Sequence, residues 1–521
     1  MRKPALSAVP VLVFLSMVVI APVVALLSLG DSFPLSTSAN LYWRDAYIRQ
    51  VLGFSIWQAF LSVTLSLSLA LLVARAFIHS SEFAGKQAIL QLFGLPLVIP
   101  SVVAVFGIVS VYGSQGWIPL GRELYGLNGI LIAHVFFNMP LAVRLLLPVW
   151  GSIPEAHWRI ARQLSLNSLQ QWRHLEWPMI REVLPGIALL LFMLCLTSFA
   201  VVLTLGGGPG STTLEVAIYQ SLRFDFEPEQ AVFLALLQFG LCATIALAAL
   251  FLQKMPEVDL SLQASPTETN TSHPVGNILI VLLAAIFVCL PILSMLVDGA
   301  RGEIIEVMTG AALWRAAALS LMIALLASSL CVIATWLLLD TTSDLYFIGR
   351  GRLAGLCELA GMVIYVIPPL VIGTGLFVLL GRVTSVFDWA IPLVVIINAV
   401  MGLPFALKTM GPEMRRSKLR YQRLCENLDL GGWHRFRIVD WPVMRQSTGF
   451  AMALVAVLAI GDLGVIALFG TPGTTTLPLM LYHQLGAYLM SEAAVTAVFL
   501  LVICLVVFRS MEYLVGGRRH A

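Results

Sequence analysis

The sequence predicts an all-α membrane protein with about twelve transmembrane helices in two parallel repeats of six. Three observations support this prediction: the composition, the spacing of apolar runs, and a polar segment that occurs twice. Of the 521 residues, 59% are hydrophobic and 11% are charged, and the mean hydropathy is +0.92. Because soluble domains contain about 25% charged residues, this chain cannot cover a water-exposed surface, and its solvent must be lipid.

Apolar runs of about 20 residues, long enough to cross a bilayer as a helix, recur along the chain. In the first half we expect spans near 9–29, 52–77, 88–112, 129–150, 186–205 and 230–252. In the second half we expect spans near 277–297, 313–339, 356–380, 390–410, 448–469 and 489–508. The first run follows Arg2-Lys3 without a small-residue cleavage site, so we interpret it as a retained signal-anchor.

These spans divide the chain into a first transmembrane half, 1–252 (core 52–252), and a second half, 277–521 (core 313–510). The intervening segment, 253–276, is polar and rich in Ser, Thr and Pro, and we expect a flexible cytoplasmic linker. With the N-terminus inside, about 24 of the 31 Lys and Arg residues fall on the cytoplasmic side. The positive-inside rule then places both termini in the cytoplasm.

The repeat is visible in several phrases. "LEWPMIRE" (175–182) matches "VDWPVMRQ" (439–446), with the Trp-Pro pair shifted by 264 positions, and "NMPLAVR" (138–144) matches "GLPFALK" (402–408). An even number of spans per half gives both copies the same orientation in the membrane. The halves are therefore expected to be parallel repeats about an axis along the membrane normal.

The repeated polar segments fill the loops between the fourth and fifth spans of each half: loop 1, residues 155–182, and loop 2, residues 419–446. Burying the seven charges of loop 1 at the bilayer centre would cost roughly 20 kcal/mol. Each loop has apolar residues at helical spacing, interrupted at Asn167-Ser168 or Gly431-Gly432. We expect two short helices joined by a tight corner and ending at Pro178 or Pro442. A solvated surface loop is the alternative, but two loops with one frame favour a pair of docking surfaces.

Catalytic and metal-binding patterns are missing from the sequence. There is no "GxxxxGK[ST]" phosphate-binding loop, so ATP hydrolysis is not expected in this chain. The seven cysteines form no CxxC pair, and the eight histidines show no ligand spacing. We expect no enzyme activity, no catalytic residue, no metal and no cofactor, and nothing indicates a nucleic-acid partner.

Loops 1 and 2 resemble the EAA loop of the permeases of binding-protein-dependent ABC importers. That pattern runs Glu-Ala-Ala, three residues, Gly, and a Leu-Pro or similar pair thirteen residues later. Counted back from Pro178 and Pro442, Ser165 and Asp429 take the Gly position. The triplet positions hold Arg159-Ile160-Ala161 and Arg423-Leu424-Cys425, so the literal signature is lost while its spacing and apolar faces remain.

Phrases such as "AVFGIVSVYGSQGW", "LIAHVFFNMPLAVRLLL" and "IGDLGVIALFG" resemble the fused thiamine permeases of that family over essentially the whole chain. The fused ferric-iron permeases are the nearest competitors. The resemblance implies a type I importer permease that moves thiamine or thiamine pyrophosphate. Its implied partners are two copies of a cytoplasmic ABC ATPase, a periplasmic thiamine-binding protein and the lipid bilayer.

The resemblance also implies which residues couple the permease to its ATPase. They are Ala161, Leu164, Ser165, Leu166, Ser168, Glu176, Trp177 and Pro178 in loop 1, and Cys425, Leu428, Asp429, Leu430, Gly432, Asp440, Trp441 and Pro442 in loop 2.

The substrate path is harder to predict. Asp462 lies within an apolar run, where a carboxylate is expensive and marks a candidate site that could face the cationic thiazolium. Capping or bonding a neighbouring helix, or a place in water near the outer end, are the alternatives. Ser198 is its repeat partner, and Asn138 is a further candidate. A secondary transporter of the major-facilitator type also has two parallel halves, but "IHSSEFAGKQ" (78–87) does not match the basic loop of that class.

Overall fold

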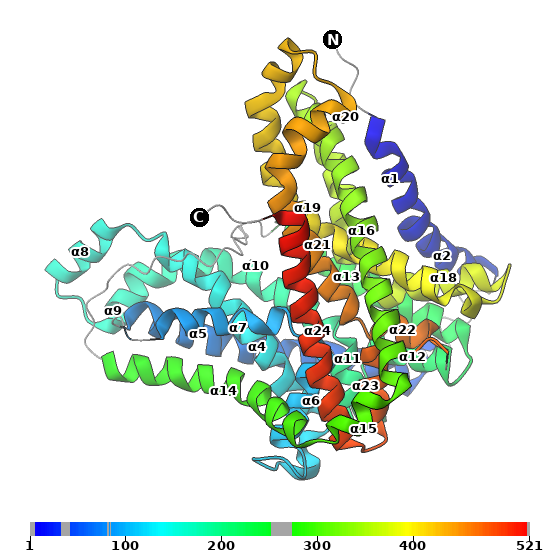
Figure 1. Cartoon of the computed structure of the whole chain (residues 1–521). Coiled ribbons are helices and arrows are strands. Elements are labelled where there is room, and N and C mark those ends of the chain that lie inside the picture. Colours follow the sequence, from blue (N-terminus) through cyan, green and yellow to red (C-terminus); the bar gives the residue numbers. More distant parts are fainter. Residues whose placement is uncertain are drawn as a thin grey trace. The chain divides into compact units, whose positions relative to one another are not determined.

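The computed structural model describes residues 6–32, 42–80, 83, 85–251, 274–471 and 473–517 (Figure 1). Across these residues the regular secondary structure is helical, without a strand. Among the described residues, ten helices are long and apolar enough to cross a membrane, or up to twelve if two sharply bent pairs each count as one span. The predicted all-α membrane class is confirmed.

The helices pack into two compact units that do not follow the halves of the sequence. The described residues of 46–216 and 241–301 form unit 2, and those of 1–45, 217–240 and 302–521 form unit 1. Two helices are divided between the units, α12 (Leu214–Arg223) and α13 (Pro228–Phe251). The predicted halves, as repeated segments of sequence, remain a prediction. Most of the predicted linker 253–276 lies outside the described residues, which resume at Pro274.

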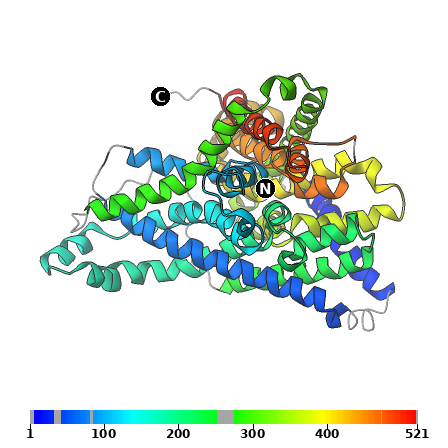
Figure 2. The same ribbon diagram turned by 90° about the horizontal axis from the view of Figure 1, so that it is seen from below.

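In unit 2, α14 runs alongside α4 (Figures 1 and 2). The helices of this unit are α4 (Ala46–His79), α5 (Lys86–Leu92), α6 (Ser101–Tyr112), α7 (Leu127–Gly151), α8 (Glu155–Gln163), α9 (Ser168–Gln171), α10 (Trp177–Leu196), α11 (Phe199–Leu205) and α14 (Pro274–Arg301).

In unit 1, α1 and α2 come from the first half of the sequence but pack against α16, α17 and α18 of the second. The helices of this unit are α1 (Val9–Leu15), α2 (Ala21–Ser32), α15 (Ile304–Thr309), α16 (Ala311–Phe347), α17 (Gly351–Met362), α18 (Pro369–Gly381), α19 (Ala390–Asn427), α20 (Gly432–Arg435), α21 (Trp441–Ile460), α22 (Gly464–Phe469), α23 (Leu477–Gly486) and α24 (Met490–Gly516).

Two predicted spans are bent rather than straight. The span near 88–112 is Lys86–Leu97 followed by Ser101–Tyr112 at 114°, and the span near 356–380 is Gly351–Val366 followed by Pro369–Gly381 at 92°. Pro100 and Pro368 stand at these breaks with extended ψ values of 137° and 146°. A proline lacks the N–H that a continuous helix needs and restricts the residue before it, so each break follows from the sequence.

Two further predicted spans, 186–205 and 448–469, are interrupted. The first ends with α10 at Leu196 before α11 begins, and the second ends with α21 at Ile460 before α22 begins. Ser198 and Asp462 stand at the two breaks. Short polar side chains at such positions compete with helical hydrogen bonds and favour helix starts, which explains why an apolar run is not one helix here.

Small residues let helices approach closely in each unit. In unit 2, a Cβ on Gly107 of α6 would lie 2.5 Å from the carbonyl oxygen of Pro291 in α14. In unit 1, a Cβ on Gly449 of α21 would lie 2.5 Å from the backbone nitrogen of Gly516 in α24. Such contacts are typical of membrane helices, where packing replaces the hydrophobic driving force.

Matching hydrogen bonds hold matching positions in the two units. Ser55 Oγ of α4 accepts from the backbone N–H of Leu214 at 2.9 Å, and Ser320 Oγ of α16 accepts from that of Leu477 at 2.9 Å. In each case a serine near the start of a long span satisfies the N-terminus of a short helix, whose first N–H groups have no partner within the helix. This correspondence supports the predicted repeat.

Candidate functional site

Loop 1 has the two-helix form that its sequence predicts, whereas loop 2 has a continuous first helix. In loop 1, Pro154 precedes α8 and separates it from α7. In loop 2, the first helix is the end of α19, which runs unbroken to Asn427. Lys418 occupies the position that matches Pro154, so loop 2 lacks the helix breaker at that point. The expectation of a short first helix in loop 2 is therefore wrong.

The corners of both loops share one backbone conformation. Ser165 has a φ of 49° and Asp429 a φ of 51°, both in the left-handed region. The next residue then bonds back across the helix end, from Leu166 N–H to the Ala161 carbonyl at 3.0 Å and from Leu430 N–H to the Cys425 carbonyl at 2.8 Å. This is the Schellman helix ending, whose left-handed position usually holds Gly.

The second helix of each loop begins two residues after a half-buried leucine, Leu166 in loop 1 and Leu430 in loop 2. In loop 1, α9 starts at Ser168, and Asn167 and Gln170 cap it by exchanging hydrogen bonds of 2.9 Å. In loop 2, α20 starts at Gly432, which has a φ of 54°. Both short helices then pass through one π-helical turn, η5 (Trp172–Glu176) or η9 (Phe436–Asp440), into the next long helix.

Large apolar side chains are exposed at both corners. Leu164 is 66% and Leu169 74% exposed in loop 1, and Leu428 is 60% and Trp433 69% exposed in loop 2. Ala161 and Cys425 are buried beneath the same corners. Clustered apolar groups on a polar segment are typical of a protein-binding surface. Figure 1 shows α8 and α9 of loop 1 beyond one end of α4 and α7.

Charged side chains surround the exposed apolar groups. In loop 1, the Arg159 side chain lies 3.0 Å from Glu155, and its hydrogen bond lowers the pKa of that exposed carboxyl. In loop 2, Arg420, Arg423 and Arg437 are exposed. Because exposed charged residues lie in the same loops, the apolar groups can bind a partner surface that is apolar at its centre and polar at its rim.

Glu176, at the end of loop 1, is fully buried and held from two helices of unit 2. Its carboxylate accepts from Arg75 Nε at 2.9 Å and Nη2 at 3.2 Å, and from Trp150 Nε1 at 3.0 Å, while His79 Nε2 lies 3.1 Å away. Arg75 also donates to the carbonyl and hydroxyl of Ser168, at 3.0 and 2.9 Å. A buried carboxylate needs this degree of pairing. We call Glu176, Arg75, His79 and Trp150 the Glu176 anchor.

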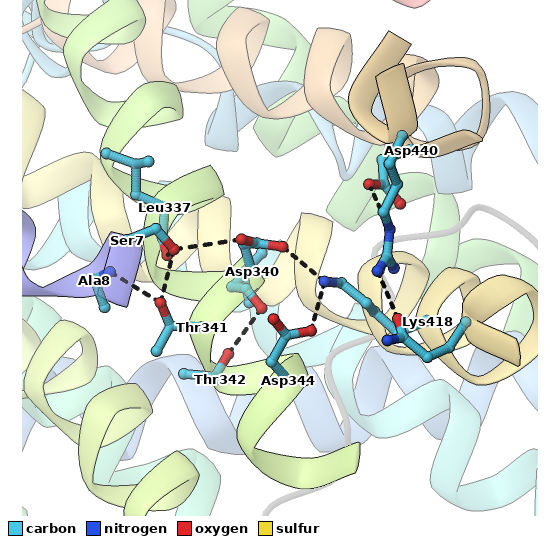
Figure 3. Close-up of polar contacts among 12 residues, drawn as sticks. Ser7, Ala8, Leu337, Asp340, Thr341, Thr342, Asp344, Lys418 and Asp440 are labelled. Carbon is cyan, nitrogen blue, oxygen red and sulfur yellow. Dashed lines mark hydrogen bonds and ion pairs between the residues drawn. The ribbon is translucent and has the colours of Figure 1, made fainter. Parts of the chain in front are cut away.

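Asp440, the matching carboxylate of loop 2, is buried but paired differently. It lies 3.2 Å from Arg435 Nε, and Arg435 Nη1 donates to Gln422 Oε1 at 2.6 Å. On the preceding turn, buried Lys418 donates to Asp340 and Asp344 of α16, both at 2.7 Å (Figure 3). We call Lys418, Asp340 and Asp344 the Lys418 anchor.

The Trp-Pro pairs close both loops. Trp177 and Trp441 begin α10 and α21, each followed by Pro178 or Pro442 in the first turn, where the missing N–H leaves nothing unsatisfied. The Trp177 ring lies 5.8 Å from that of Trp172, and the Trp441 ring lies 6.0 Å from that of Phe436. Aromatic contacts thus fix the direction in which each loop enters its span.

Each of the three substrate-path candidates has its own surroundings within its unit. Asp462 accepts from Asn398 Nδ2 at 3.1 Å and from the backbone N–H of Val465 at 3.3 Å, so it caps α22 and joins it to α19. Asn138 is buried and donates to Cys195 Sγ at 3.1 Å. Ser198 precedes α11 without a side-chain capping bond. The capping alternative accounts for Asp462, and a substrate contact remains a prediction for all three.

Sequence reasoning missed the partners of the buried Glu176 and Lys418 side chains. Arg75 and His79 are four residues apart near the end of α4, and Asp340 and Asp344 are four residues apart near the end of α16. Asp340 and Asp344 follow Arg75 and His79 by 265 positions. Paired charges at matching ends of two apolar helices were the available signal.

The chain was compared with known proteins. No protein-family model matches it. It is 40% identical over 489 residues to the thiamine transport system permease protein ThiP of Brucella abortus (strain 2308), covering 92% of this chain and 90% of that protein. It is 41% identical over 485 residues to the protein of the same name from Escherichia coli (strain K12), covering 91% and 90%. The Salmonella typhimurium protein of that name is 40% identical over 524 residues, covering 98% and 97%. Near-complete coverage at such identity confirms the resemblance, and the chain belongs to the family of thiamine transport system permease proteins.

Proposed function

We propose that this chain is the membrane-spanning permease subunit of an ATP-driven, binding-protein-dependent importer that moves thiamine or thiamine pyrophosphate across the bacterial inner membrane. Two copies of a cytoplasmic ATPase bind loops 1 and 2, and a periplasmic thiamine-binding protein delivers the substrate. Both termini lie in the cytoplasm, on the side to which the positive-inside rule assigns most Lys and Arg residues.

The observation that supports this proposal best is the matched pair of corners. Ser165 and Asp429 give both helix ends the same left-handed turn, and Leu164 and Leu428 are exposed immediately before it. One symmetric ATPase dimer needs two similar receiving surfaces, and the chain presents one per loop. The thiamine class is supported by the thiamine transport system permease proteins that match nearly the whole chain.

The loops are suited to transmit motion because each continues into a membrane helix. Loop 1 passes through η5 into α10, and loop 2 through η9 into α21, with no interruption of the helical path. When ATP draws the two ATPases together, the corners move with them and carry α10 and α21 along. ATP drives this change through its different affinity for the two arrangements.

The docking role is tested by adding a charge to each exposed corner. Leu164→Asp and Leu428→Asp place a carboxylate on an apolar contact without disturbing a buried core. We expect each variant to weaken co-purification of the ATPase from detergent, and the double variant to abolish uptake of radiolabelled thiamine in a deletion strain.

Ala156→Asp is the matched control, because it adds the same charge to an exposed position of α8 away from the corner. It should leave assembly and uptake unchanged. Full ATPase binding and full uptake in the double variant would refute the assignment of these corners.

A further inference from the structure

The ends of α4 and α16 carry basic and acidic side chains, respectively, at matching positions. Arg75 and His79 stand one turn apart on α4, and Asp340 and Asp344 stand one turn apart on α16. In membrane proteins, a charged side chain near the end of a span needs no protein partner when it reaches water. Here each pair instead holds a buried group of the opposite sign, Glu176 or Lys418.

In unit 2, the anchor joins loop 1 directly to the second span. One guanidinium, that of Arg75, contacts Glu176 at the end of η5 and Ser168 at the start of α9. Its Cζ also lies 5.5 Å from the centre of the Trp172 ring, between these two positions. Trp150 adds a contact from α7. The second half of loop 1 is therefore held against α4 at Ser168, Trp172 and Glu176.

In unit 1, the connection has two steps. Arg435 joins α20 to Gln422 of α19, and Lys418, one turn earlier on α19, joins that helix to α16. Figure 3 shows Lys418 reaching the two carboxylates, with Ser7 on the far side of Asp340. Ser7 Oγ lies 3.3 Å from Asp340 Oδ2 and 2.8 Å from Thr341 Oγ1, which also ties the N-terminal segment to α16.

We propose that the Glu176 anchor and the Lys418 anchor are positioning sites that make the second span of each half move with its coupling loop. This inference rests on the proposed function. Without an anchor, a displaced loop pulls directly only the helices that are continuous with it, α10 after loop 1, and α19 and α21 on either side of the loop 2 corner. With the anchor, α4 or α16 is displaced together with those helices.

A stabilising role alone explains these ions poorly. Buried ion pairs contribute little to stability relative to apolar side chains of the same size, because desolvation offsets their attraction. A buried ion pair instead favours one arrangement of the helices, because the Glu176 carboxylate is paired where Arg75, His79 and Trp150 meet. That property suits a joint that must transmit movement without slipping.

The test measures coupling in the assembled transporter, with permease, ATPase and binding protein reconstituted in liposomes. Glu176→Gln and Lys418→Met are expected to raise the amount of ATP hydrolysed per thiamine imported several-fold relative to the wild-type chain. The conservative variants Glu176→Asp and Lys418→Arg keep the charge and should recover most of the coupling. Arg416→Met, which removes an exposed ion pair with Glu413, is the matched control.

An unchanged ratio of ATP to thiamine in Glu176→Gln and Lys418→Met would overturn the inference. If Glu176→Gln does not fold, Trp150→Phe removes one hydrogen-bond donor from Glu176 while keeping an aromatic ring, and the same ratio decides. Failure of the proposed function has a different signature, because the wild-type chain would then neither retain the ATPase nor import thiamine upon its addition.

Discussion

Loops 1 and 2 have nearly the same backbone but are held in place by different side chains. The left-handed corner and the π-helical turn occur at positions that differ by 264 residues. The buried carboxylates Glu176 and Asp440 also match. Yet the first contacts Arg75 and His79 on α4 and Trp150 on α7, whereas the second pairs with Arg435 inside its own loop.

This difference shows which features the two loops share and which they do not. Both loops have a left-handed corner and a helix restart, with different residue types at these positions. The buried group that contacts the neighbouring long helix differs in sign, Glu176 beside α4 and Lys418 beside α16. The two loops therefore have one backbone form although the charges that hold them in place are exchanged.

The largest expected effect comes from giving α4 the residue found at the matching position of α16. Arg75→Asp would face Glu176 with a second carboxylate and leave Ser168 without its donor. We expect the free energy of unfolding to fall by about 5 kcal/mol, the upper end of the range for breaking a buried ion pair. Thermal unfolding and yield of the purified chain in detergent measure it.

Arg416→Asp is the control for that substitution, because it reverses an exposed charge whose ion pair with Glu413 joins residues three apart on one helix. It should change stability by less than about 0.5 kcal/mol. Equal melting temperatures for the two variants would show that the Glu176 anchor contributes no more than a surface pair.

A second prediction separates the loops by their exposed surfaces. Leu169 and Trp433 occupy matching positions and are similarly exposed, but tryptophan is far more often a dominant contact in interfaces. We expect Trp433→Ala to weaken ATPase binding by about 2–4 kcal/mol and Leu169→Ala by about 1 kcal/mol. Titration of the purified ATPase onto permease in nanodiscs measures both.

Neither of these alanine variants should alter unfolding, because both side chains lie largely outside the packed interior. If Leu169→Ala proves the more damaging of the two, loop 1 rather than loop 2 provides the stronger docking surface, and the ranking inferred from residue type is wrong.

Much of this fold could be predicted because its strongest signals are local. Apolar runs of span length gave the helices, and the Trp-Pro pairs gave the ends of both loops. The bends at Pro100 and Pro368 were missed because hydropathy alone does not distinguish a straight span from one broken by proline. The early ends of α10 and α21 were missed for a similar reason, since Ser198 and Asp462 are single polar residues inside apolar runs.

The anchors could not be predicted with the same certainty because they are contacts between distant segments. Glu176 was recognised as a member of loop 1, but its partners lie 97 and 101 residues earlier in the chain. Lys418 read as one more cytoplasmic cation, and its burial depends on how α16 packs against α19. The match between the ends of α4 and α16 is hard to see in the sequence, because the matching residues are basic on α4 and acidic on α16.

The smallest expected effect concerns the corners themselves. Ser165 and Asp429 hold positive φ angles that disfavour residues with a Cβ, so Gly should relieve strain at either position. Ser165→Gly should stabilise the chain by about 0.5–1 kcal/mol, and Asp429→Gly by less, because Asp tolerates the left-handed region better than Ser.

Thermal unfolding of both variants tests this ranking, with Ser168→Gly as the control. Ser168 begins α9 in an ordinary helical conformation and its hydroxyl accepts from Arg75, so glycine there should destabilise rather than stabilise. If Ser165→Gly raises the stability and Ser168→Gly lowers it, the left-handed backbone at the corner, and not loop flexibility in general, decides whether glycine stabilises the chain. Equal gains at Ser165 and Asp429 would contradict the predicted ranking, because Asp would then tolerate the left-handed conformation no better than Ser.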